Sequence, residues 1–127
     1  MVAITSFYAG VLTILFIGLS AQVILYRRKH RIAYGDADTP RFTAMVRAQG
    51  NFAEYAPLGL ILLGLAELNG AGAILLHMIG LPLLAGRVMH GLGLAFVPRQ
   101  MRWRVWGMMA TATSLAIGAC AALLLAL

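Results

Sequence analysis

Residues 47–57 read Arg47-Ala48-Gln49-Gly50-Asn51-Phe52-Ala53-Glu54-Tyr55-Ala56-Pro57, and they lead directly into the apolar run Leu58-Gly59-Leu60-Ile61-Leu62-Leu63. Hydrogen-bonding side chains are costly in a helix that continues into a bilayer, so a group of five needs a reason. Residues three and four positions apart are neighbours on an α-helix, so four of these side chains share one face: Arg47, Asn51, Glu54 and Tyr55. The spacing predicts a polar stripe about two turns long, with Gln49 off the stripe.

The composition is that of a membrane protein. Of the 127 residues, 61% are hydrophobic and 11% are charged, and the mean hydropathy is +0.87, whereas a soluble domain is about one quarter charged. The predicted fold class is an all-α integral membrane protein. The net charge of +6 does not indicate nucleic acid as a partner, because the basic residues crowd two short segments beside apolar runs. A single cysteine, Cys120, excludes an intrachain disulfide and a cysteine-based metal site, and no metal is expected.

The hydropathy pattern predicts one domain, 1–127, with a bundle of four transmembrane helices at about 4–26, 40–68, 73–96 and 103–127. The first is long enough to span a bilayer core of about 30 Å. A basic cluster follows it at 27–31 in place of a small-residue cleavage site, so it is interpreted as a membrane helix and not as a signal peptide. Pro40 is expected to begin the second helix, and Pro57 is expected to bend it.

Charged loops define the predicted orientation. Both basic loops lie on one side of a four-span protein, at 27–41 and 99–104, while the termini and the turn at 69–72 carry no Lys or Arg. The positive-inside rule places the basic loops in the cytoplasm and both termini outside. Glu67 is expected to face water at the outer surface. The start of the fourth helix carries residues typical of interface anchors, namely Trp103, Arg104 and Trp106. Compact loops and the lack of a targeting extension favour a bacterial inner membrane.

Two interpretations of the polar stripe remain open. One is a set of buried side chains that bond across a helical bundle, and the other is a ligand site. The ligand site is favoured by the excess of positive charge, because Glu54 can neutralise only one of the six arginines on the cytoplasmic side. These arginines are Arg27, Arg28, Arg47, Arg87, Arg99 and Arg102. Arginine binds carboxylates through paired hydrogen bonds, so an anionic, amino-acid-like or peptide-like molecule fits. His90, one turn after Arg87 on the same face, either lines this site or cross-links helices.

The motif at 47–57, Arg-Ala-Gln-x-Asn-x-x-Glu-Tyr-x-Pro, resembles the signature of the MAPEG family, the membrane-associated proteins of eicosanoid and glutathione metabolism. Microsomal glutathione transferases and leukotriene-C synthase belong to that family. The resemblance covers most of the chain. The segment Ser20-Ala21-Gln22-Val23-Ile24, followed by Arg27-Arg28, is similar to the end of the family's first helix, and Gly86-Arg87 resembles its third-helix arginine.

The resemblance implies a homotrimer of four-helix subunits that binds glutathione as co-substrate between adjacent subunits, in the cytoplasmic half of the membrane. The implied glutathione contacts are Arg27, Arg47, Gln49, Asn51, Glu54 and Tyr55, and the candidate binding site is completed by Arg87 and His90. The chain departs from the family at His90 and Leu94, where tyrosines are expected. It also has Met101 where the thiol-activating arginine is expected, so the candidates for that catalytic role are Arg102, then Arg28 and Arg99.

The predicted function is that of a glutathione transferase or peroxidase. A cationic arginine lowers the pKa of the glutathione thiol, and the thiolate attacks a lipophilic electrophile or a lipid hydroperoxide that comes from the bilayer. The expected partners are therefore the other subunits of the homotrimer, lipids and a lipophilic substrate. Two alternatives stay open. One is a non-catalytic trimeric scaffold that binds lipid or glutathione, and the other is a small multidrug exporter, although such exporters carry a carboxylate in their first span and this chain has none there.

Overall fold

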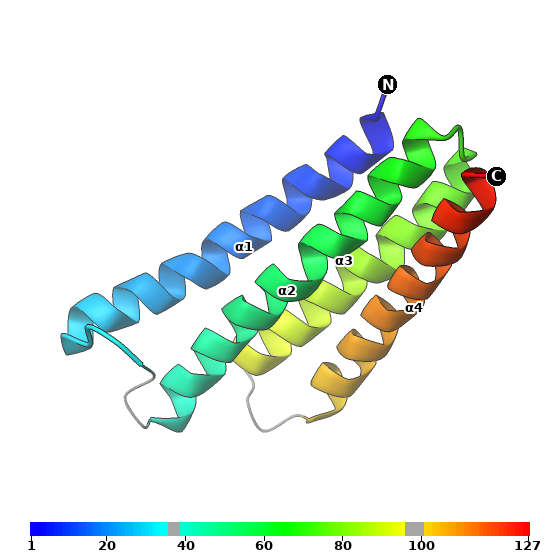
Figure 1. Ribbon diagram of the computed structural model, residues 1–127. Helices are drawn as coiled ribbons and strands as arrows, with labels where there is room; N and C mark the ends of the chain where they lie inside the picture. The colour runs from blue at the N-terminus through cyan, green and yellow to red at the C-terminus, as the bar shows by residue number, and fades with distance from the viewer. Residues whose placement is uncertain (36–38, 96–100) are drawn as a thin grey trace.

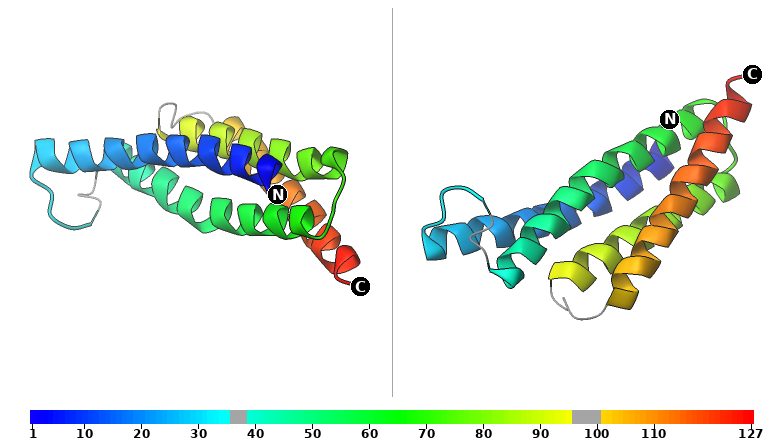
Figure 2. Two further views of the ribbon diagram at one scale, coloured as in Figure 1. Left: turned by 90° about the horizontal axis from the view of Figure 1, so that it is seen from above. Right: turned by 60° about the horizontal axis from the view of Figure 1, so that its bottom comes forward.

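The computed structural model describes residues 1–35, 39–95 and 101–127. Nearly all of them belong to four helices: α1 (Ala3–His30), α2 (Pro40–Leu68), α3 (Ala73–Ala95) and α4 (Met101–Leu125). Successive helices run in opposite directions, with both chain termini and the α2–α3 turn at one end of the bundle (Figure 1). The two further views keep the termini at the same end (Figure 2). The all-α class predicted from the composition is confirmed.

The end of α1 differs from the sequence-based prediction. The helix continues through the basic cluster to His30, so Arg27, Arg28 and Lys29 form its last turn. The negative end of the helix dipole stabilises cations in this position, which is why charged residues expected in a loop are helical. Arg31 ends the helix in the left-handed conformation, with φ 54°, and the backbone N–H of Ile32 donates to the carbonyl oxygen of Arg27 at 3.0 Å.

Helix α2 begins at Pro40 and continues without a break through Pro57 to Leu68. Thr39 precedes it in an extended conformation, and its hydroxyl makes no capping hydrogen bond. The helix contacts each of the other three helices. Because of this central position, the side chains of the 47–55 stripe can meet residues from every other helix.

Helices α3 and α4 pack backbone against backbone. A Cβ atom at Gly107 would lie 2.7 Å from the backbone nitrogen of His90 and 2.8 Å from the carbonyl oxygen of Gly86, and both distances are too short for real contacts. Small residues of this kind let membrane helices approach closely. Ser114 adds a hydrogen bond between the two helices, since its hydroxyl donates to the carbonyl oxygen of Ile79 at 2.6 Å.

Polar contacts close the end of the bundle that holds the termini. The carboxylate of Glu67 accepts from the backbone N–H groups of Ile4 at 3.0 Å and Thr5 at 2.7 Å. It therefore caps the first turn of α1, where N–H groups have no partner within the helix, and it does not simply face water as expected. The hydroxyl of Tyr8 makes a hydrogen bond of 2.9 Å with Nδ1 of His77. These contacts tie α1 to the end of α2 and the start of α3.

The outside of the bundle is largely apolar, and its exposed side chains include Ile14, Ile17, Ile61, Leu81 and Leu123. An extended apolar surface of this kind suits contact with lipid chains. Among the described residues, three helices are long and apolar enough to cross a membrane, namely α1, α4 and residues 73–94 of α3. Helix α2, with 29 residues, has the length as well, but it carries the charged side chains of Arg47 and Glu54.

Candidate functional site

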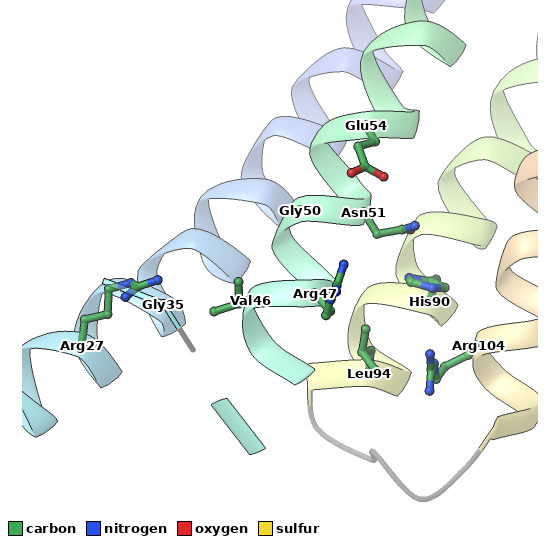
Figure 3. A pocket seen from close by; sticks show the side chains of 10 residues that line it. All are labelled: Arg27, Gly35, Val46, Arg47, Gly50, Asn51, Glu54, His90, Leu94 and Arg104. Atoms are coloured by element: carbon green, nitrogen blue, oxygen red, sulfur yellow. The ribbon is translucent and has the colours of Figure 1, made fainter. Parts of the chain in front are cut away.

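An open cavity of about 780 Å³ lies at the end of the bundle away from the chain termini (Figure 1), and Figure 3 shows the side chains that line it. Its volume falls in the range of about 300–1,000 Å³ that is usual for small-molecule sites. All four helices and the segment after α1 contribute to its wall, which consists of Arg27, Gly35, Val46, Arg47, Gly50, Asn51, Glu54, His90, Leu94 and Arg104.

Helix α2 supplies one continuous wall of this cavity. Arg47, Asn51 and Glu54 follow one another at spacings of four and three residues, and all three line the cavity, as expected for residues on one helix face. In the single subunit Arg47 and Glu54 are exposed, whereas Asn51 is half-buried. Tyr55, the fourth member of the stripe, lies behind the wall, where the guanidinium carbon of Arg87 is 5.3 Å from the centre of its ring.

Three buried nitrogen atoms of the cavity wall have no hydrogen-bond partner in the described part of the chain: Nη1 of Arg27, Nδ1 of His90 and Nε of Arg104. They come from α1, α3 and α4 respectively. A buried polar atom without a partner is unfavourable by about 1–3 kcal/mol, and native proteins contain few of them. Their presence in the wall of one cavity indicates that a ligand with hydrogen-bond acceptors fits there.

The side chain of Arg27 is held in place by aromatic rings. Its guanidinium carbon lies 5.0 Å from the centre of the Phe42 ring. Phe42 in turn stacks on Tyr26, with 4.6 Å between the ring centres and 10° between the planes. A guanidinium over an aromatic face is attracted by the negative face of the ring quadrupole, so this arginine is positioned at the cavity before any ligand binds.

Arg87 does not line the cavity, because its side chain lies in the interior and is 1% exposed. Its Nε and Nη2 donate to the hydroxyl oxygen of Thr111 at 3.0 and 2.7 Å, and its Nη1 donates to Oδ1 of Asn51 at 2.7 Å. A further contact of 3.3 Å joins Nη2 to the sulfur of Met108. None of these partners carries a negative charge. The residue is therefore a buried cation that supports the α2 wall from behind.

The structure brings part of the predicted site together. Five of the residues expected to bind glutathione line the cavity, namely Arg27, Arg47, Asn51, Glu54 and His90. Gln49 points elsewhere, since its amide nitrogen donates to the hydroxyl of Ser20 on α1 at 3.2 Å. The candidate catalytic residues Arg28 and Arg102 are exposed and do not line the cavity, and Arg99 lies outside the described residues.

Arg104 is the site residue that sequence reasoning missed. It was interpreted as an interface anchor, yet it lines the cavity beside His90 and Leu94 (Figure 3). One signal could have identified it. The thiol-activating arginine was expected at position 101, and a residue three positions further along an α-helix shares the same face. Arg104 therefore shares a helix face with position 101, and its place on the cavity wall was open to prediction from that spacing.

A family model of the MAPEG family matches residues 5–125. The chain is also 38% identical over 108 residues to the inner membrane protein YecN of Escherichia coli strain K12, and the match covers 85% of this chain and 81% of that protein. The protein of the same name in Escherichia coli O6:H1 matches with the same values. The predicted localisation in an inner membrane is confirmed by this comparison.

Proposed function

The chain belongs to the MAPEG family, and from this membership together with the cavity we propose that it binds glutathione as co-substrate. The family includes glutathione transferases and peroxidases. The observation that carries the proposal is the wall itself, in which three arginines from three helices and a buried histidine surround a single carboxylate. Such a wall favours a ligand with more negative than positive charge.

The charges of glutathione match this arrangement. At neutral pH the tripeptide has two carboxylates, one ammonium group and one thiol. Arg27 and Arg47 offer planar groups that can bind carboxylates through paired hydrogen bonds, and Glu54 offers the acceptor for the ammonium group. Asn51 can donate to a carboxylate or a peptide carbonyl. The apolar side chains of Val46 and Leu94 complete the wall.

Arg104 is the residue we assign to thiol activation. The thiolate is the nucleophile, and a free thiol with a pKa of about 8.5 is mostly protonated at neutral pH. A guanidinium N–H that reaches the sulfur lowers the pKa of the thiol, because it stabilises the negative charge. The Nε of Arg104 is buried at the cavity and has no partner among the described residues. In conjugation, the thiolate forms a bond to the electrophilic carbon of a lipophilic substrate and displaces the leaving group on that carbon. In the peroxidase reaction, it attacks the terminal oxygen of a lipid hydroperoxide, the O–O bond breaks, and the lipid alcohol is released after protonation. Glutathione is then left as its sulfenic acid, from which the thiol of a second glutathione displaces water to form the disulfide.

The same proposal includes the topology and the assembly predicted from the sequence. Helix α2 spans the membrane as the other three helices do, the basic loops predicted from the sequence face the cytoplasm, and both termini lie outside. Three subunits form a homotrimer, with glutathione between neighbours. The exposure of Arg47 and Glu54 in a single subunit supports this assembly, because charged side chains facing lipid are costly and a neighbouring subunit would cover them. Lipids and the lipophilic substrate reach the site from the bilayer.

The experiment is glutathione binding and turnover by the purified protein in lipid nanodiscs. We expect binding by calorimetry, and a rise in thiolate absorbance when glutathione is added. Arg47→Ala should weaken binding. Arg104→Ala should lower the thiolate absorbance and the rate of conjugation, while Arg102→Ala, the matched control with the same loss of charge two residues away, should change neither. Equal effects of the two substitutions would remove Arg104 from the mechanism, and a protein that does not bind glutathione would refute the proposal.

A second function, that of a non-catalytic glutathione-binding scaffold, is favoured by one observation. Position 101, where the family's thiol-activating arginine is expected, holds an exposed methionine. Glutathione binding with no thiolate absorbance in the wild-type protein would support the scaffold and exclude the enzyme.

A further inference from the structure

The buried cation Arg87 has a fixed orientation. The hydroxyl of Thr111 donates its hydrogen to the carbonyl oxygen of Gly107 at 2.9 Å, so its oxygen is left to accept from both Nε and Nη2 of Arg87. The guanidinium is planar and rigid. Once two of its nitrogens are bound to α4, Nη1 must point in one direction, and in that direction it meets the side chain of Asn51 on α2 at 2.7 Å.

This contact determines which way the amide of Asn51 faces. A guanidinium has only donors, so the atom that it contacts must be the amide oxygen and not the nitrogen. The NH₂ group is then the free end of the side chain. Asn51 lines the cavity and its side chain points from α2 toward α3 (Figure 3), and no described residue accepts a hydrogen bond from its amide nitrogen. Without Arg87, the amide could turn over and present either end.

We propose that Arg87 is a positioning residue that locks Asn51 as a hydrogen-bond donor toward the cavity, so that the site selects a carboxylate or carbonyl group of the ligand at this point. This inference rests on the proposed function, because glutathione is the ligand whose selection it explains. It gives the buried charge a role beyond holding the helices together. If Arg87 only linked the helices, its contacts to Thr111 and to any acceptor on α2 would be enough. Asn51 also lines the cavity, so the orientation that Arg87 imposes on its amide acts on the ligand.

The first test compares glutathione with two analogues, each with one of its carboxylates converted to a primary amide. In the wild-type protein, one analogue should bind roughly tenfold or more weakly than glutathione, because a donor on the ligand meets a donor on the protein. Arg87→Met removes the hydrogen bond that holds the amide of Asn51 in one orientation, so the ratio of the affinities for glutathione and this analogue should fall toward one. Arg87→Lys keeps the positive charge and hydrogen-bond donors but not the planar group that holds the orientation, so it should retain only part of the ratio. A substitution that only loosened the packing would weaken all three ligands alike and leave the ratio unchanged, and that result would overturn the proposal.

The second test needs no ligand and uses two substitutions at Asn51. Asn51→Asp keeps the oxygen that Arg87 contacts and adds a charge, so the thermal unfolding midpoint should stay the same or rise. The side chain in Asn51→Leu has a similar volume but no acceptor, which leaves Nη1 of Arg87 with only its longer contact of 3.4 Å to the backbone carbonyl oxygen of residue 51, so the midpoint should fall. At the same time Asn51→Asp loses the donor, and its affinity for glutathione should drop roughly tenfold or more. Wild-type affinity in Asn51→Asp would overturn the proposal, as would equal midpoints for the two variants.

Failure of the proposed function gives a different pattern. A wild-type protein that binds neither glutathione nor its analogues refutes the glutathione site, yet the unfolding midpoints of Asn51→Asp and Asn51→Leu still report whether Arg87 contacts the amide oxygen. Conversely, wild-type binding of glutathione with the same affinity ratio in Arg87→Met leaves the glutathione site standing and rejects the positioning role.

Discussion

Replacing Gly107 with alanine should force α3 and α4 apart beside the cavity. The added methyl carbon would lie 2.7 Å from the backbone nitrogen of His90 and 2.8 Å from the carbonyl oxygen of Gly86, whereas ordinary van der Waals contact begins at 3.4 Å. Both neighbours are backbone atoms, so no side chain can rotate away to make room. The helices must therefore separate by several tenths of an ångström along this contact.

The expected loss of stability follows from two opposing effects. Overpacking a close contact typically costs about 1–3 kcal/mol, while alanine has a helix propensity better than that of glycine by up to about 1 kcal/mol. We expect a net destabilisation of about 1–2 kcal/mol. The separation also moves Arg104 relative to His90, because the two lie on opposite sides of the contact, so the affinity for glutathione should fall as well.

The assay is thermal unfolding of the purified protein, with Gly10→Ala and Gly50→Ala as controls. A Cβ atom at either control position would meet no described atom within 4 Å, so these variants should be as stable as the wild type or slightly more stable. Gly50 also lines the cavity, which makes it a control for changes near the site. If Gly107→Ala unfolds at the same temperature as the two controls, α3 and α4 are not in backbone contact there and the reasoning is refuted.

Three further predictions use other contacts. Glu67→Ala removes the cap of α1 and should lower stability by about 0.5–2 kcal/mol, measured by thermal unfolding, whereas Glu54→Ala, which caps no helix, should have a smaller effect. Tyr8→Phe removes the hydrogen bond to His77 and should lower stability by about 0.5–1.5 kcal/mol, an effect that should vanish when His77 is already replaced by phenylalanine. Raising the salt concentration from about 0.1 M to 1 M shortens the screening length from about 10 Å to 3 Å. Because Arg47 and Glu54 are exposed, calorimetry should then show weaker glutathione binding. Binding that does not depend on salt would exclude a charge-driven site.

The hydropathy pattern was enough to predict the class of the fold, because long apolar runs separated by charged loops leave few alternatives. The family membership was predicted from the 47–57 motif and is confirmed. The end of α1 was less predictable, since the same basic cluster can follow a helix or form its last turn. The choice depends on the left-handed conformation of Arg31, which no pattern of charge reveals.

Pairings between distant residues were the part of the site that the sequence could not supply. Spacing placed Arg47, Asn51 and Glu54 on one face of a helix, and they line one cavity. Spacing could not show that Arg87 turns inward, because its partner Thr111 is 24 residues away on another helix. The general rule that arginine beside tryptophan anchors a helix at the membrane surface pointed away from Arg104. Only the packing of α4 against α3 turns that side chain toward the cavity.

The polar face of α2 also affects how the chain inserts into the membrane during its synthesis. In the proposed four-span topology, α2 is the helix least able to insert into the bilayer by itself. A charged side chain at the centre of an isolated span adds about 2.5–3.5 kcal/mol to its insertion free energy. The short turn after Leu68, in which Gly70 has φ 83°, keeps α2 beside the apolar helix α3. We therefore expect α2 to enter the bilayer only as half of a helical hairpin. Nascent chains that end after α2 should leave it in water, and chains that include α3 should carry it into the membrane.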